Sequence, residues 1–514
     1  MTLDDAIQMA LKNNLELEIE KTNIEAAHNA IQAAKGAFDP YVRLQSAFEN
    51  RNTPAASVLQ GSSGKLNEKF FNNTAGLRQK VFSNGGSYTA DFDAARQTST
   101  NPFTSLNPLT SSRLSFGYMQ PLLRNRKIDR ERAELLIRNK QAGVSQIEFE
   151  LRVVDVINRV EQAYWDLTGA RQDVAVKTDA VKLAQEQLDR NKRMIDSGTL
   201  APIELSASQS ELDRRKDTRL ASVGVVTELE NQLKTLLVGD KGAEIWGQEI
   251  IPSETAMVSP PEWKELSLAL AKALAQRPEL KQLAERLAIS TIEMEANREQ
   301  TKAQVNLFGN YSFSGLAGSL RPGENPFSAS NIPLYDRLNK LSALAGLPAF
   351  VPPSGGSLPD FLIGGYGSTL GNLFSGRYQT VQAGLSIDIN LRNRASQAAV
   401  AQSAINERKL KLERARTEQA IAVQVRNALQ SLETARERIV ASESSANAAQ
   451  EKLESELRLF QTGESTNFFV LTRQNEFLDS RRREVLARLD FNKAAARLES
   501  AIGQTLENRK IRIK

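Results

Sequence analysis

The chain has no cysteine and a single histidine, His28, among its 514 residues. Without cysteine it forms no disulfide framework and no Cys/His zinc site. The single histidine, which lies in a polar, alanine-rich run, also argues against a nucleophile–histidine pair, and we interpret it as structural. No phosphate-binding loop, metal-ligand spacing or converging pair of carboxylates is present in the sequence either. We therefore expect no enzyme, with no catalytic, cofactor-binding or metal-binding residues.

Long apolar runs and an excess of one charge are also missing. No stretch of about 20 apolar residues is present, so no transmembrane helix is predicted. The 66 Lys and Arg residues nearly balance the 61 Asp and Glu residues, and they are dispersed, which indicates no nucleic-acid partner. The first residues, MTLDDAIQMALKNN, lack the basic start and apolar core of a signal peptide. We expect either a cytosolic protein or a mature chain whose leader was removed.

Two long helices are the strongest signal that is present. Residues 394–462 contain no Gly or Pro, and residues 125–197 contain only Gly143 and Gly169. Their apolar residues recur at intervals of three and four, which predicts coiled-coil packing. The seams are Val153, Ile157, Val160, Tyr164 and Leu167 in the first helix and Ile421, Val425, Ala428 and Leu432 in the second. Each long helix runs to a glycine, Gly198 or Gly463, and a second helix follows. We predict two helical hairpins with these glycines as left-handed caps at the tips.

The segments before each long helix alternate with period two instead. One face is apolar and the other polar in residues 41–49, 88–94, 114–118, 305–313 and 381–389. This pattern is typical of transmembrane β-strands between lipid and a wet lumen, although a half-buried strand of a soluble sandwich alternates in the same way. Polar segments rich in Gly, Ser and Pro predict long loops at 51–73, 97–112 and 315–376, the last with a short amphipathic helix at 334–344.

The chain is also duplicated internally. Leu3, Ala6, Ala10, Leu17, Val42 and Leu44 match Leu266, Ala269, Ala273, Leu280, Val305 and Leu307 at an offset of 263, and Arg124-Asn125-Arg126 matches Arg392-Asn393-Arg394 at 268. The first repeat, 1–262, has a helix, strands at about 39–120, a helical hairpin at 125–238 and a connector at 239–262. The second, 263–514, has a helix, strands at about 304–391, a hairpin at 394–502 and a C-terminal tail.

Two strands per repeat are too few for one chain to close a barrel. A sheet in hydrocarbon cannot leave the backbone groups of its edges unpaired, because each unpaired group costs several kcal/mol. We therefore predict a barrel that is shared between chains related by cyclic symmetry. A further hairpin around residues 83–86 would add strands or extend the barrel beyond the membrane.

The order of these motifs resembles the TolC family of outer-membrane efflux proteins over about residues 1–510. The resemblance is carried by Asn13–Leu17 (NNLEL), by Ala275–Leu280 (AQRPEL, similar to the family's NRPDL), by Gln120–Leu123 (QPLL) and by both glycine tips. It implies an α+β membrane protein built from a duplicated helix–strand–helix unit. Three chains would share one transmembrane β-barrel, of about 12 strands at two strands per repeat, continued by a long periplasmic α-helical coiled-coil barrel.

The resemblance also implies a function and partners. The homotrimer would be a passive exit duct in the outer membrane of a Gram-negative bacterium, extending into the periplasm, with its signal peptide removed. Its partners would be a periplasmic adaptor protein, an inner-membrane efflux or ABC-type transporter, and outer-membrane lipid. It would conduct small molecules in drug efflux or proteins in type I secretion. The alternative is a coiled-coil scaffold without channel activity, which explains the helices but not the lipid-type strands.

The resemblance places a periplasmic gate just beyond the second tip. Family members often carry acidic residues six and nine positions after the tip glycine, where this chain has Phe469 and Thr472. We expect a constriction formed by Glu204, Phe468, Phe469, Thr472 and Arg473; in the alternative, the two Phe side chains pack between the tip helices. The expected adaptor contacts are Ser197, Gly198, Thr199, Thr462, Gly463 and Glu464, because short glycine turns let another backbone approach closely. The alternative is that these turns only cap helices.

Overall fold

The computed structural model describes residues 1–55, 64–239, 243–254, 265–321, 326–351 and 358–511. The predicted boundary between the repeats, at 262/263, lies outside these residues. The chain forms two compact units, and each takes segments from both halves of the sequence. We call them the helical unit (Met1–Ala30, Arg138–Ser290, Ile405–Lys514) and the sheet unit (Ile31–Ile137, Thr291–Ala404).

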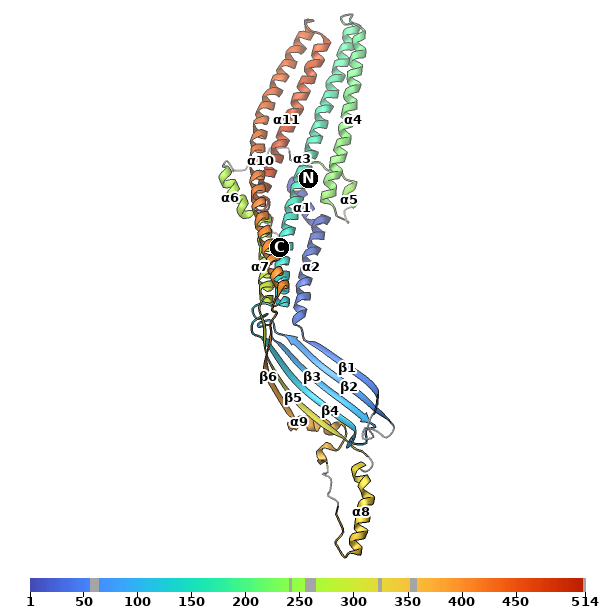
Figure 1. Ribbon diagram of the computed structural model, residues 1–514. Helices are drawn as coiled ribbons and strands as arrows, with labels where there is room; N and C mark the ends of the chain where they lie inside the picture. The colour runs from blue at the N-terminus through green and yellow to red at the C-terminus, as the bar shows by residue number, and fades with distance from the viewer. Residues whose placement is uncertain (56–63, 240–242, 255–264, 322–325, 352–357, 512–514) are drawn as a thin grey trace. The chain divides into compact units, whose positions relative to one another are not determined.

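The helical unit contains both predicted hairpins (Figure 1). Helices α3 (Arg130–Asp196) and α4 (Ile203–Leu237) form the first hairpin, and α10 (Arg394–Gln461) and α11 (Asn467–Ile502) form the second. Helix α3 starts at Arg130 rather than at residue 125, because the Asp129 carboxylate accepts the Arg132 amide N–H at 2.8 Å and caps the helix. The other helices with residues in this unit are α1 (Leu3–Asn13), α2 (Leu15–Lys35), α5 (Ala243–Trp246), α6 (Leu266–Gln276), α7 (Pro278–Gln300) and α12 (Thr505–Asn508). Across the described residues, no helix combines the length and the apolarity that crossing a membrane requires.

The predicted seams are the cores of this unit. Val160 and Val425, which match at an offset of 265 in the duplication, are both fully buried. The first seam packs with α1 and α4, and the second packs with α6 and α11. Ala6 on α1 and Ala269 on α6 are likewise equivalent and both fully buried. The two repeats therefore build two cores in the same way.

Both repeats also break their first helix at the same place. Asn14 separates α1 from α2, and Arg277 separates α6 from α7, with nearly identical ψ angles of 125° and 124°. The Asn14 side chain caps α2 by accepting the N–H groups of Glu16 and Leu17, at 2.9 and 3.3 Å. Pro278 starts α7, where its missing N–H costs no hydrogen bond.

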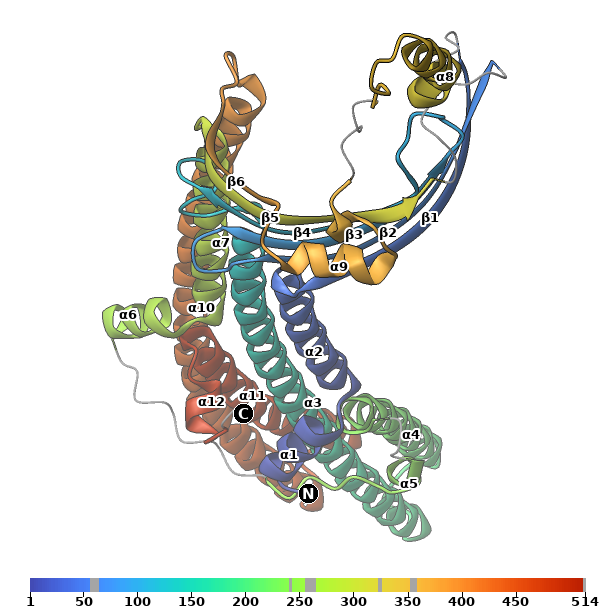
Figure 2. The ribbon, with the colours of Figure 1, turned by 90° about the horizontal axis from the view of Figure 1, so that it is seen from below.

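The sheet unit has one six-stranded antiparallel sheet in the order β1-β2-β3-β4-β5-β6 (Figures 1 and 2). Its strands are β1 (Tyr41–Pro54), β2 (Lys65–Lys80), β3 (Ser87–Ser99), β4 (Leu106–Pro121), β5 (Gln304–Leu320) and β6 (Gln379–Asp388). The predicted turn at residues 83–86 joins β2 and β3, with Gly85 at a φ of 71°. Each strand pairs with its sequence neighbour, so β1 and β6 are the two free edges within the chain.

The prediction of two strands per repeat is wrong for the first repeat, which has four. The count of twelve for three chains rested on four strands per chain, whereas the described residues of one chain form six. The predicted hairpin around residues 83–86 implied a strand on each side of its turn, but only residues 88–94 showed alternation. Strand β2 shows no regular alternation because Phe70 and Phe71 are consecutive and therefore face opposite sides. The predicted loops at 51–73 and 97–112 were also too long. The two ends of the first predicted loop in fact pair in register, as Arg51 with Glu68 does.

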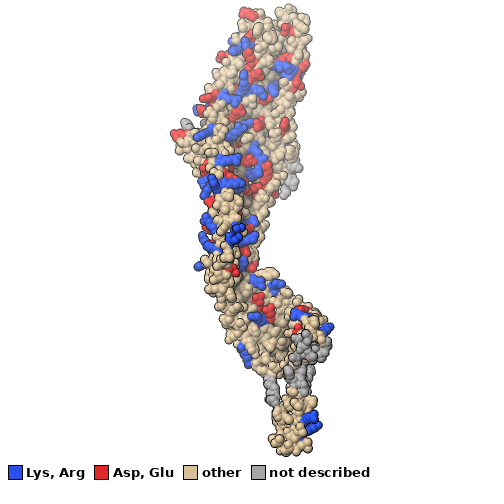
Figure 3. Space-filling view, viewed as in Figure 1, with Lys and Arg blue, Asp and Glu red and all other residues tan. Residues whose placement is uncertain are grey.

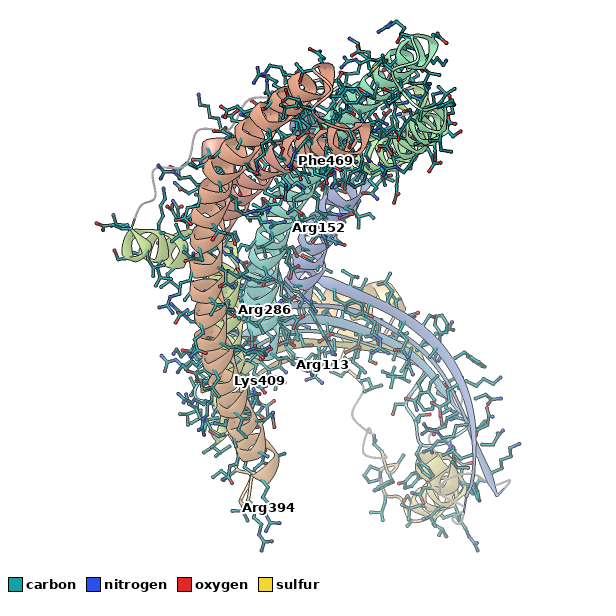
Figure 4. All side chains as sticks on the ribbon, turned by 90° about the horizontal axis from the view of Figure 1, so that it is seen from above. Arg113, Arg152, Arg286, Arg394, Lys409 and Phe469 are labelled. Carbon is teal, nitrogen blue, oxygen red and sulfur yellow. The ribbon has the colours of Figure 1, made fainter. Side chains whose placement is uncertain are left out.

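The two faces of the sheet differ sharply in polarity. One row of neighbours across all six strands consists of Val42, Leu77, Ala90, Phe116, Tyr311 and Val381. The adjacent row, which points to the opposite face, consists of Arg43, Gly76, Asp91, Ser115, Ser312 and Thr380. The sheet is curved (Figure 2), and Arg113, which belongs to the polar face, lies on its concave side (Figure 4). The apolar face is therefore convex.

The segment between β5 and β6 contains helices where a long loop was predicted. The predicted helix at 334–344 is the second part of α8 (Pro326–Leu344), and α9 (Tyr366–Phe374) was not foreseen. Helix α9 packs on the convex face, where Thr369 Oγ1 lies 2.5 Å from Thr110 Oγ1 and the Asn372 amide donates to the Leu316 carbonyl at 2.9 Å. Gly315 lets the backbone of α9 approach β5.

Gly315→Ala should loosen α9. A Cβ atom at this position would clash with the Thr369 carbonyl oxygen and lie 2.7 Å from the Leu373 amide nitrogen. We expect a loss of about 1–3 kcal/mol, the usual result of overpacking, seen as a lower apparent melting temperature in detergent. Gly309→Ala is the matched control, because it lies on the same strand and face with open space around it. Equal melting temperatures for the two variants would contradict the packing of α9.

Candidate functional site: the tips of the helical hairpins

The two hairpin tips are the same structure built twice. At the first tip, the Gly198 amide donates to the Ile195 carbonyl and the Thr199 amide to the Met194 carbonyl, both at 2.9 Å. At the second tip, the equivalent bonds run from Gly463 and Glu464 to Phe460 and Leu459, at 3.3 and 2.9 Å. This pattern is the Schellman motif, in which a left-handed residue ends the helix. The φ angles of Gly198 and Gly463 are 75° and 82°, so the predicted glycine caps are confirmed.

The residues that were predicted to contact an adaptor are all exposed at these tips. They are Ser197, Gly198, Thr199, Thr462, Gly463 and Glu464. Nothing lies within 4 Å of a Cβ atom placed on either glycine, so the backbone is open to contact. The Ser197 and Thr199 hydroxyls lie 3.0 Å apart and both bond to the Met194 carbonyl. The tips therefore offer small polar side chains around an accessible backbone turn.

The predicted gate residues of the second repeat lie along the first turns of α11 (Figure 4). The rings of Phe468 and Phe469 contact each other edge to face, with centroids 5.7 Å apart. Phe468 is 70% exposed and Phe469 is 49% exposed, so within one chain the pair does not pack between the tip helices. Thr472 donates to the Phe468 carbonyl at 2.9 Å, and Arg473 forms an ion pair with Glu476 at 2.8 Å.

Glu204 of the first repeat meets the start of α11 as well. Its carboxylate accepts the side-chain amide of Asn467 at 3.0 Å, and the Asn467 side-chain oxygen accepts the amide of Gln187 at 3.0 Å. Asn191 continues the network to Ser208 at 2.7 Å. Gln187, Asn191, Ser208 and Asn467 are all at most 3% exposed. Buried polar groups are stable only when they are paired, so this network fixes α11 against the first hairpin.

A second buried link between the hairpins centres on Arg215, which is 4% exposed. Its guanidinium donates to Glu211 at 2.7 Å and to the Ala180 carbonyl at 3.1 Å, both within the first hairpin. It also reaches Gln474 and Asn475 on α11, at 3.4 Å each. One cation thus bridges three helices, as the fork of five donors on an arginine permits.

A third link is the ion pair between Asp173 on α3 and Arg482 on α11, at 2.8 Å. Burial alone would raise the pKa of Asp173, but hydrogen bonds and charge from Lys177 and Arg482 outweigh it and hold this pKa below its usual value. The carboxylate is therefore charged at neutral pH. Lys493 and Asp166 form a fourth contact between the same helices.

The sequence did not predict these links. The sequence patterns assigned no role to Gln187, Asn191 or Asn467. A usable signal was their position, because Gln187 directly precedes the buried Leu188 and Asn191 follows it by three, which places polar groups near the core stripe. The partners, however, lie in the other half of the sequence. Among the described residues, no group of three or more His, Asp or Glu side chains is arranged to hold a metal ion.

Asn467→Ala should loosen the second tip from the first hairpin. The change would leave the buried amide of Gln187 without its Asn467 acceptor, at a cost of about 1–3 kcal/mol. We expect faster amide hydrogen exchange in the first turns of α11. Thr466→Ala serves as the control, because Thr466 is exposed and its side chain makes no capping hydrogen bond. Exchange at the same rate in both variants would show that the network does not hold the tip.

The sequence and the structure were compared with those of known proteins. A model of the family described as "Outer membrane efflux protein" matches residues 353–504. No curated protein sequence matches the chain.

Solved structures are similar over nearly the whole length. The CmeC outer membrane channel of Campylobacter jejuni is 14% identical with a TM-score of 0.62, and the alignment covers 99% of this chain and 88% of that one. The outer membrane protein VceC of Vibrio cholerae is 12% identical with a TM-score of 0.63, at 98% and 96% coverage. The MtrE outer membrane channel of Neisseria gonorrhoeae is 14% identical with a TM-score of 0.58, at 98% and 88% coverage. Part of the chain thus matches the outer membrane efflux protein family, and the whole chain has the fold of these outer-membrane channels, as its resemblance to the TolC family predicts.

Proposed function

We propose that the protein is the passive outer-membrane exit duct of an efflux or secretion system. The observation that carries this proposal is the curved sheet, which has an apolar convex face, a polar concave face and two free edges. Val42, Leu44 and Phe48 on β1 are 61–79% exposed in the single chain. A lipid-facing wall accounts for this exposure, and a polar lumen accounts for the opposite face. The family match and the similar channels support the same function.

The duct would be a homotrimer in the outer membrane of a Gram-negative bacterium, with the helical hairpins in the periplasm. The helices suit an aqueous compartment, because their visible face carries interspersed acidic and basic side chains (Figure 3). The hairpin tips would bind a periplasmic adaptor, and an inner-membrane efflux or ABC-type transporter would supply the energy. The cargo would be small molecules or proteins.

A coiled-coil scaffold without channel activity is the competing function. A scaffold in water would have to bury the row of Val42, Leu77, Phe116 and Val381, each of which is 42–73% exposed. Helix α9 covers only the end of β4 and β5 near Thr110 and Gly315. Because so much contiguous apolar surface on a soluble protein marks an interface, the membrane duct explains the sheet better.

The trimeric duct predicts the mass of the purified particle. The protein should require detergent, and light scattering corrected for bound detergent should give the mass of three 56.8 kDa chains. The reason is that only a closed barrel pairs both free edges in hydrocarbon. A monomer or dimer that stays soluble without detergent would rule out the shared barrel and favour the scaffold.

We further propose that the constriction of the duct lies at the second tip, with Phe468 and Phe469 as its narrowing side chains and Thr472, Arg473 and Glu204 beside them. Their exposure in one chain leaves the aromatic rings free to face a central pore. The buried link between Glu204 and Asn467 would hold this segment in place. The exposed tip residues around Gly198 and Gly463 would then take the adaptor.

Phe469→Ala should raise single-channel conductance in planar bilayers, because it removes a ring from the proposed constriction. Val440→Ala on α10 is the control, since it also removes an exposed apolar side chain but lies far from the tip in the sequence. Its conductance should equal that of the parent protein. Unchanged conductance in Phe469→Ala would remove Phe469 from the gate without affecting the proposed duct.

A further inference from the structure

Among the residues that the structure describes, the first repeat contains a β-hairpin that the second repeat lacks. Strand β1 is equivalent to β5, because Val42 and Leu44 match Val305 and Leu307 at an offset of 263. Strand β4 is equivalent to β6, because Arg124-Asn125-Arg126 and Arg392-Asn393-Arg394 follow them, and both asparagines adopt positive φ angles, 63° and 26°. The hairpin β2–β3 therefore lies between β1 and β4. In the second repeat, α8 and α9 lie between the corresponding strands, β5 and β6.

This inserted hairpin is part of the wall rather than a projection from it. It supplies Leu77 and Ala90 to the apolar row and Gly76 and Asp91 to the polar row. β2 and β3 are 16 and 13 residues long, which exceeds the 9–11 residues that a tilted strand needs to cross a bilayer. The hairpin is thus paired, amphipathic and long enough to span.

The free edges are suited to meet between copies. The chain has an even number of antiparallel strands, so β1 and β6 run in opposite directions. The β6 edge of one copy would therefore meet the β1 edge of the next as an ordinary antiparallel pair. The strands are also staggered along the sheet. Tyr41 is the first residue of β1, but the row of paired residues that begins there ends at Gln382, in the middle of β6. Such a stagger accompanies the strand tilt that a closed barrel needs.

We propose that three copies of this chain close an eighteen-stranded barrel through β1–β6 contacts, and that the inserted hairpin widens the exit for bulky hydrophilic cargo. This inference rests on the proposed trimeric duct. Barrel diameter grows roughly linearly with strand number, so eighteen strands give about 1.5 times the diameter of twelve, and barrels of 16–18 strands hold an aqueous channel. The concave face fits such a channel, because its row consists of charged, hydroxyl-bearing and glycine residues.

The width of an eighteen-stranded barrel adds a class of cargo, bulky hydrophilic solutes, to the proposed function. A lumen of this size accommodates solutes with the bulk of a polypeptide, and the row of Arg43, Asp91, Ser115 and Ser312 lines it with polar groups that can hydrogen-bond to such a chain. A narrow twelve-stranded exit would instead form if β1 and β2 stayed outside the ring, with β3 of one copy against β6 of the next.

Cysteine crosslinking separates these two arrangements, and the absence of native cysteine leaves no background reaction. Leu44→Cys on β1 would be combined, one at a time, with cysteines on the same face of β6 at Val381, Ala383, Leu385 and Ile387. Phe92→Cys on β3 lies in the same row as Leu44 and is the matched control series. A thiol crosslinker that reaches about 8 Å joins facing and diagonal neighbours on adjacent strands but not residues three strands apart.

We expect covalent dimers and trimers with at least one of the Leu44→Cys pairs and with none of the Phe92→Cys pairs. Each variant must first form particles with the same mass as the parent protein. Crosslinks from Phe92 would overturn the eighteen-stranded barrel in favour of the narrower ring. An absence of crosslinks in both series would also overturn it, because the four positions, with the diagonal reach of the crosslinker, cover this face of β6 from Gln379 to Ile387. In either case a particle mass of three chains would leave the proposed duct standing, whereas a detergent-independent monomer would remove both proposals.

Discussion

The backbone of a sheet edge cannot be left unpaired in hydrocarbon, and the sheet unit follows from this constraint once it is placed in a membrane. Four of the six strands have a partner on both sides, whereas β1 and β6 each lack one. A soluble protein protects such edges with charge, proline or a bulge. Here the edge strands carry Val42, Leu44, Val381 and Leu385 on one face, which suits contact with lipid and pairing with another copy.

The helical unit meets a different constraint, because long helices with charged outer faces need internal cores. The duplication supplies two of these, one around Val160 and one around Val425. Polar links then join the two hairpins near their tips, through Asn467, Arg215 and Asp173. Apolar contacts alone would stabilise many relative positions of the two hairpins along their length about equally. Hydrogen-bonded groups that are buried and fully paired specify one register, which suits a segment proposed to form a gate.

Sequence patterns predicted the parts of the fold that depend on local spacing. Tyr164 and Val425 were placed in cores by their three- and four-residue intervals, and Gly198 and Gly463 were placed at tips because only glycine takes that conformation freely. Features that depend on tertiary contacts were missed. Strand β2 lost its alternation at Phe70 and Phe71, and α9 contains two glycines that favour a loop. Helix α9 forms because Thr369 and Leu373 pack on β4 and β5. The pairing of Glu204 with Asn467 joins the two halves of the chain, which no local pattern can reveal.

The unequal insertions in the two repeats have an evolutionary consequence. In the first repeat the insertion is β2–β3, between β1 and β4. In the second repeat it is α8–α9, between the corresponding strands β5 and β6. Neither changes the cores around Ala6 and Ala269 or the glycine caps of the tips. A change in one inserted segment can therefore add or remove strands of the sheet while the hairpin tips keep their structure. The width of the sheet and the surface of the tips can thus change independently of each other in evolution.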